Sequence, residues 1–104
     1  MHTLSRLEAT IAQRLTASPD TSYVAKLHAR GVTKIAQKVG EEATETVIAA
    51  LAGDADELVG EAADLLFHLM VLLAEKGVAL DTVLTELDRR EGLSGLAEKA
   101  ARSQ

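Results

Sequence analysis

The segment KVGEEATETVIAALAGDADELVGEAAD, residues 38–64, decides the fold that this sequence predicts. Apolar residues recur at helical spacing on both sides of GDAD, residues 53–56. Gly53 is a natural helix terminator and Asp54 a natural cap for a following helix. We therefore expect two long helices, about 33–52 and 55–76, folded by this turn into an antiparallel hairpin.

Shorter helical segments flank this hairpin. The residues before the second of them, Thr21 and Ser22, are both suitable caps, and Gly31 is a suitable terminator. The three segments expected from apolar spacing run over about 4–15, 23–30 and 81–92.

No alternating strand pattern is present, so the predicted fold class is all-α, an antiparallel helical bundle. A chain of 104 residues is long enough for one modest core. We expect a single domain over 1–92 and a C-terminal tail over 93–104.

Composition excludes several classes of protein. There is no cysteine, which fits a reducing, cytoplasmic location. Arg6, Glu8 and Arg14 interrupt any signal-peptide core, and no apolar run approaches the roughly 20 residues that span a bilayer. The net charge of −5 argues against general nucleic-acid binding. We expect neither a membrane nor a nucleic-acid partner.

The second long helix has more apolar surface than one small chain can cover. From Leu65 to Ala74 every residue but His68 is apolar. An arc of about 60° on this helix holds the polar residues Glu57, Glu61, Asp64, His68 and Glu75. In the first long helix an apolar stripe roughly 120° wide includes Ile35 and Val47. A helix that is apolar on most sides must be buried on most sides, so we expect a homodimer, most simply two-fold, to complete the bundle.

Acidic residues gather on both long helices. Glu41 and Glu45 are four residues apart and Glu61 and Asp64 are three apart, so each pair projects from one helix face. Glu42 and Glu45 lie about eight to eleven residues before the turn, and Glu61 and Asp64 about as far after it. In an antiparallel hairpin the two groups face each other, and Mg²⁺ is the cation that such oxygen ligands suit best.

The alternative is that these acids form an ordinary solvated helix face. Gly40 and Gly60, inside the helices beside acidic residues, suggest the close approach of a ligand or a backbone; simple tolerance of glycine is the other reading. His68 is more often a satisfied core residue than a functional one. No Glu-x-x-His pair of a di-iron bundle is present.

A basic segment precedes the acidic one. Residues 21–40 contain no acid. The segment suggests a polyanion whose phosphates bridge a metal ion and basic side chains. The alternative is pairing along the helix, for example Lys38 with Glu42. The candidate phosphate-binding residues are Lys26, Arg30, Lys34 and Lys38.

The motifs EEATE (41–45) and EAAD (61–64) resemble the EExxE…ExxD signature of the all-α nucleotide pyrophosphohydrolases, the MazG-like superfamily. More narrowly, SYVAKLHARGVTKIAQKVGEEATETVIAAL (22–51) and ELVGEAADLLFHLMVLLAEKGVAL (57–80) are similar to the phosphoribosyl-ATP pyrophosphohydrolase family. The resemblance covers about residues 4–90, and we expect the stand-alone form of the enzyme, without the cyclohydrolase domain that some relatives carry.

The resemblance implies an enzyme that hydrolyses phosphoribosyl-ATP to phosphoribosyl-AMP and pyrophosphate with Mg²⁺, in histidine biosynthesis. Glu42, Glu45, Glu61 and Asp64 would hold the metal, and Glu41 would orient the attacking water or support the ligands. Two other functions stay open: a house-cleaning nucleoside triphosphate pyrophosphohydrolase, and a non-catalytic helical dimerisation module.

Overall fold

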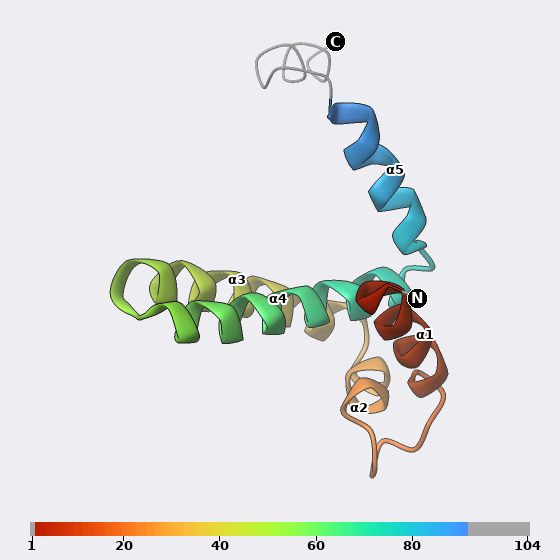
Figure 1. The fold of residues 1–104 in the computed structure, drawn as a ribbon. Helices are drawn as coiled ribbons and strands as arrows, with labels where there is room; N and C mark the ends of the chain where they lie inside the picture. Colours follow the sequence, from red (N-terminus) through yellow and green to blue (C-terminus); the bar gives the residue numbers. More distant parts are fainter. Residues whose placement is uncertain (1, 92–104) are drawn as a thin grey trace.

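The computed structural model describes residues 2–91, and within them all regular structure is helical (Figure 1). The prediction of an all-α fold is therefore confirmed, and each predicted helix boundary falls within two residues of the observed one. The predicted tail over 93–104 lies outside the described residues. The five helices are α1 (Thr3–Arg14), α2 (Tyr23–Arg30), α3 (Val32–Ala52), α4 (Ala55–Glu75) and α5 (Leu80–Arg90).

The helix ends follow the capping signals in the sequence. The Ser22 hydroxyl accepts a hydrogen bond from the Ala25 N–H at 3.2 Å and starts α2. The Asp54 carboxylate accepts one from the Glu57 N–H at 2.8 Å and starts α4. Gly31 has a φ of 92° between α2 and α3, a backbone conformation that glycine adopts far more easily than other residues.

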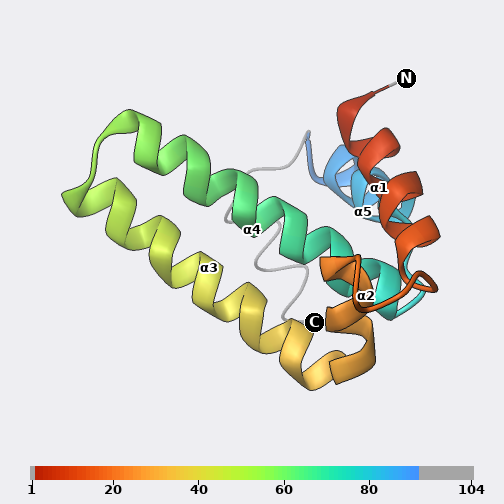
Figure 2. The same ribbon diagram turned by 90° about the horizontal axis from the view of Figure 1, so that it is seen from below.

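Helices α3 and α4 form the predicted antiparallel hairpin and run side by side along their length (Figures 1 and 2). Helices α1 and α2 pack at the end of the hairpin that is remote from the 53–56 turn. The apolar core lies at this end and joins α1, α2, α3, α4 and the first residue of α5. Its buried members are Ile11, Val24, Leu27, Ile35, Met70, Val71 and Leu80.

Helix α5 leads away from the body of the molecule (Figure 1). The Glu8 carboxylate of α1 accepts a hydrogen bond from the Leu80 N–H at 2.7 Å, which satisfies one of the free N–H groups at the start of α5. This contact and the burial of Leu80 fix the point at which α5 begins.

Within residues 2–91, no other helix covers the half of the hairpin near the turn. Val47, on the apolar stripe of α3, is 57% exposed in the single chain, whereas Ile35, Glu42 and Ala49 are buried. The buried residues of α3 are therefore spaced seven positions apart, on the face that packs on α4. Among the described helices, none is both long enough and apolar enough to cross a membrane. The exposed apolar residues of this half include Val47, Ile48, Leu51, Leu58, Val59 and Leu66.

Candidate active site

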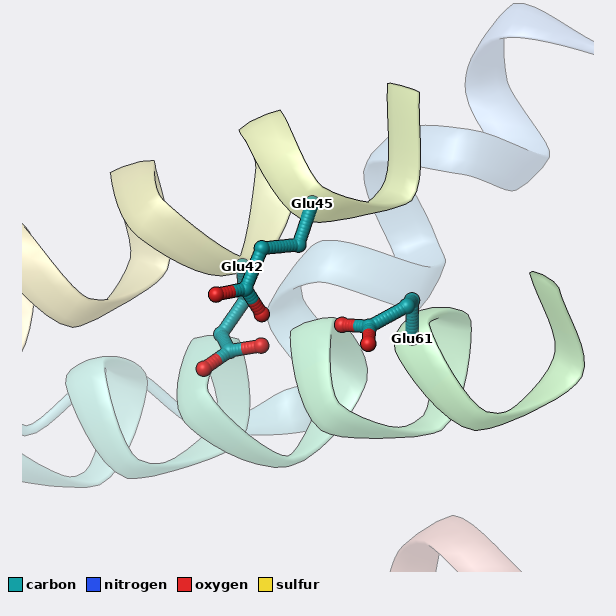
Figure 3. A group of neighbouring side chains, drawn as sticks. All are labelled: Glu42, Glu45 and Glu61. Atoms are coloured by element: carbon teal, nitrogen blue, oxygen red, sulfur yellow. The ribbon is translucent and has the colours of Figure 1, made fainter. Parts of the chain in front are cut away.

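Three carboxylates converge between the two long helices. Glu42 and Glu45 reach from α3 and Glu61 reaches from α4, and one oxygen of each lies within 4.8 Å of the others (Figure 3). The residues lie at matching heights because they are spaced almost symmetrically about the turn. We refer to Glu42, Glu45 and Glu61 as the carboxylate cluster.

The backbone beneath the cluster is fixed by Thr46. Its hydroxyl lies 2.7 Å from the carbonyl oxygen of Glu42 and 3.3 Å from that of Glu61, so it can donate its one hydrogen to either. Thr46 therefore ties α3 to α4 at the level of two cluster members. Sequence reasoning missed this residue, although its position four residues after Glu42 on the same helix face was a usable signal.

Without a counter-charge, bringing these carboxylates together in a partly buried place lowers the stability of the fold. Glu42 is only 7% exposed, and its Oε2 and that of Glu61 are buried with no hydrogen-bond partner among the described residues. Burial, reinforced by the Glu45 carboxyl, raises the pKa of Glu42 above its ordinary value. Contact with the Glu45 carboxyl, reinforced by desolvation, raises the pKa of Glu61 in the same direction.

These features fit a divalent cation. The donor set is all oxygen, as Mg²⁺ prefers, and it comes from two rigid helices. A cation between the three carboxylates would be coordinated by the two unpartnered oxygens. Its charge would also compensate the repulsion that contributes to both raised pKa values.

The cluster opens into a pocket of about 330 Å³, which we call the acidic pocket. Asp64, predicted as a fourth ligand, lines this pocket but lies outside the 4.8 Å group. Glu57 also lines it, and so does Gly60. A Cβ at Gly60 or Gly40 would meet no atom within 4 Å, so no backbone of the described chain approaches either glycine closely.

Glu41 does not join the cluster. Its carboxylate is exposed and accepts hydrogen bonds from Gln37 Nε2 at 2.8 Å and from Lys38 Nζ at 3.3 Å. Gln37 first, and then Lys38, lower the pKa of Glu41 below its ordinary value. Lys38 Nζ also lies 3.7 Å from Glu42, which confirms the pairing foreseen between these two residues. Lys38 is thus the basic residue that borders the cluster.

His68 is a buried residue with both ring nitrogens hydrogen-bonded, which agrees with its interpretation as a core residue. It is 6% exposed, and its Nδ1 lies 2.7 Å from the carbonyl oxygen of Asp64. A carbonyl only accepts, so Nδ1 donates; in the neutral ring Nε2 then accepts from the Tyr23 hydroxyl at 2.8 Å. Phe67 stacks on Tyr23 at 6.1 Å between ring centroids. Sequence reasoning missed Tyr23, which links α2 to the backbone of Asp64.

The four basic residues singled out from the sequence come together in one place. A pocket of about 480 Å³, which we call the basic pocket, lies where α2 meets the first half of α3. Apolar atoms of Pro19, Leu27 and Ala29 contribute to its walls, as does Tyr23. The basic side chains that line it are Lys26, Arg30, Lys34 and Lys38.

Comparison with known proteins gives a consistent result. A model of the family described as phosphoribosyl-ATP pyrophosphohydrolase matches residues 4–91. A phosphoribosyl-ATP pyrophosphatase of Erythrobacter litoralis is 72% identical over 102 residues, covering 98% of both chains. One of Novosphingobium aromaticivorans is 72% identical over 100 residues, covering 96% of this chain and 94% of the relative. One of Zymomonas mobilis is 62% identical over 100 residues with the same coverage.

Proposed function

The chain belongs to the phosphoribosyl-ATP pyrophosphohydrolase family, and we propose that it hydrolyses phosphoribosyl-ATP to phosphoribosyl-AMP and pyrophosphate. The reaction is the second step of histidine biosynthesis and takes place in the cytoplasm. The observation that carries the proposal is the convergence of Glu42, Glu45 and Glu61 from two helices, with two buried oxygens unpartnered.

The carboxylate cluster, with Asp64 at the edge of its pocket, would hold Mg²⁺. When bound, this ion would neutralise triphosphate charge and stabilise the charge that develops on the leaving pyrophosphate. Glu45, the exposed member of the cluster, faces the acidic pocket and is available to orient a water molecule toward phosphorus. The Thr46 hydroxyl, within hydrogen-bond distance of the carbonyl oxygens of Glu42 and Glu61, supports the spacing of α3 and α4 at the cluster.

The remaining predicted residues, Glu41 and the four basic residues, lie outside the carboxylate cluster. Glu41 acts through Lys38, whose ammonium group it holds beside Glu42. Because Glu41 is turned away from the cluster, we assign it a positioning role rather than direct contact with the attacking water. Lys26, Arg30, Lys34 and Lys38 bind phosphate groups of the substrate in the basic pocket.

The test is release of pyrophosphate from phosphoribosyl-ATP with and without Mg²⁺. Wild type should release pyrophosphate only when Mg²⁺ is present. Glu45→Gln should lose at least about a hundredfold in kcat/KM, since metal-assisted charge stabilisation contributes several kcal/mol. Glu57→Gln is the matched control, because Glu57 lines the same pocket outside the cluster. A panel of ordinary nucleoside triphosphates should turn over far more slowly. Faster turnover of that panel would favour the house-cleaning activity instead.

A homodimer is part of the proposal. The uncovered half of the hairpin exposes Leu51 at 84%, Val59 at 68% and Val47 at 57%, which is unusual for large apolar side chains that gather in one region. A second copy with a two-fold axis would cover this surface. Light scattering should give twice the chain mass for wild type and the monomer mass for Val59→Asp. A monomeric wild type would refute this part of the proposal and leave the chemistry untouched.

A further inference from the structure

The basic pocket carries positive charge that the chain does not neutralise. Within residues 2–91, Lys26, Arg30 and Lys34 form no salt bridge and no side-chain hydrogen bond, whereas Lys38 alone is paired, with Glu41 and Glu42. Such a group of charges over partly apolar walls is suited to an anionic group attached to an organic body.

The basic and acidic pockets are separate sites, and α3 contributes residues to each of them. They share no lining residue. Lys34 precedes Glu45 by eleven residues, which places its backbone about 17 Å from that of Glu45 along the axis of α3, whereas Lys38 lies nearer and its Nζ reaches Glu42 at 3.7 Å. One compact phosphate chain held at the carboxylate cluster does not also fill the basic pocket, so a ligand that occupies both must be elongated and anionic at each end.

The two pockets are also connected. Tyr23 lines the basic pocket, and its hydroxyl bonds His68, which in turn bonds the carbonyl of Asp64 beside the acidic pocket. Lys38 lines the basic pocket and touches Glu42. The basic pocket is therefore joined to the acidic pocket and the carboxylate cluster by contacts that run through α2, α3 and α4.

Phosphoribosyl-ATP has the required form, since it is ATP that carries a second, phosphorylated ribose. Resting on the proposed function, we infer that the basic pocket binds the monophosphate of this phosphoribosyl group while the triphosphate occupies the acidic pocket. Arg30 and Lys34 are then specificity-determining residues. ATP lacks the monophosphate and forfeits their contacts, so the pocket selects phosphoribosyl-ATP over ordinary nucleoside triphosphates.

Product inhibition separates the two ends of the substrate. Phosphoribosyl-AMP keeps the monophosphate arm, and pyrophosphate comes from the other end. In Arg30→Gln and Lys34→Gln, the KM for phosphoribosyl-ATP and the inhibition constant of phosphoribosyl-AMP should each rise about tenfold or more, because charge-assisted hydrogen bonds to phosphate are lost. The inhibition constant of pyrophosphate should stay within twofold of wild type. Lys76→Gln, an exposed lysine outside the pocket, is the matched control and should change neither constant.

Two results would overturn the inference. A rise in the pyrophosphate inhibition constant equal to that of phosphoribosyl-AMP would place the leaving group, not the monophosphate, in the basic pocket. Unchanged constants for both products would show that the pocket binds no part of the substrate. Both are readable only if wild type releases pyrophosphate from phosphoribosyl-ATP, so failure of the proposed function would be recognised first and separately. Thermal unfolding of each variant checks that the fold is intact.

Discussion

The acidic and basic pockets both include residues of α3, yet they carry opposite charge. The acidic pocket brings Glu42, Glu45 and Glu61 together and leaves two buried oxygens without partners. In the basic pocket Lys26 and Arg30 are exposed, Lys34 and Lys38 are half-buried, and of these four only Lys38 is in an ion pair. The first can be completed by a small cation and the second by an anion. A metal–nucleotide substrate, as proposed above, would supply both and would compensate each charge excess on α3.

The largest effect is expected at Glu61, because it alone brings a cluster carboxylate from α4. Glu61→Gln should reduce kcat/KM by at least about a hundredfold in saturating Mg²⁺. In metal-free buffer the same variant should melt at a higher temperature than wild type, since like-charge repulsion with Glu45 is removed. Activity assays test the expected loss of kcat/KM, and thermal melts test the expected rise in melting temperature. A variant that is less stable than metal-free wild type would contradict the repulsion argument.

The second expected effect is a pH dependence that differs between the cluster and the surface. Glu42 and Glu61 have raised pKa values, so the folded protein keeps protons that the unfolded chain has lost. Their contribution to stability is full below the ordinary glutamate pKa and is lost as pH rises through the folded values. Metal-free wild type should therefore lose stability over this window, and Glu42→Gln/Glu61→Gln should not.

Glu86 provides the opposite case. Hydrogen bonds from Arg89 and then Arg90 lower its pKa to about 2. Its contribution is present above the ordinary glutamate pKa and is lost as pH falls through the folded value. Urea midpoints measured from about pH 4 to about pH 8 should fall for wild type as pH rises above the ordinary glutamate pKa, and those of Glu86→Gln should run parallel to wild type there. Wild-type stability that rises across the window would refute the assignment.

Tyr23 tests the connection between the pockets. Tyr23→Phe keeps the ring packing with Phe67 but removes the hydrogen bond to His68 Nε2. The expected loss of unfolding free energy is about 1 kcal/mol, because a buried nitrogen is left without that partner. Chemical denaturation measures it. No change in stability would mean that water replaces the hydroxyl without cost. Phe67→Leu keeps the hydrogen bond and serves to separate the packing contribution.

The smallest effect is expected at Lys38, which lines the basic pocket and pairs with Glu42 of the carboxylate cluster. Lys38→Gln removes partly exposed ion pairs with Glu41 and Glu42, typically about 0.5 kcal/mol of stability for such pairs. The same change takes a positive charge away from the cluster, so Mg²⁺ should bind more tightly than in wild type. Calorimetric titration with Mg²⁺ checks the direction. Weaker binding would show that Lys38 organises the cluster rather than competing with the cation.

Local signals in the sequence were sufficient for the helices and for the heights of the cluster residues. Ser22 and Asp54 are capping residues whose hydrogen bonds form within three residues, so their role is readable without tertiary structure. Glu42, Glu45 and Glu61 face each other because a short turn and a fixed rise per residue determine the register of a helical hairpin.

Features that depend on packing between distant segments were not predictable. The exposure of Val47 follows from the rotation of α3 against α4, and the Tyr23–His68 hydrogen bond joins residues 45 positions apart. Asp64 shares the motif with Glu61, but the structure places it at the pocket wall rather than in the cluster. The gathering of four basic residues in one pocket needed the angle between α2 and α3, which Gly31 sets.

The central claim is that carboxylates from α3 and α4 share a divalent cation. Crystals grown in Mn²⁺, which substitutes for Mg²⁺ at oxygen sites and gives an anomalous signal, test it most directly. The account predicts an anomalous peak bounded by the side chains of Glu42, Glu45 and Glu61, and its loss in Glu61→Gln. Manganese bound elsewhere on the protein, with those three carboxylates turned apart and no peak between them, would contradict it.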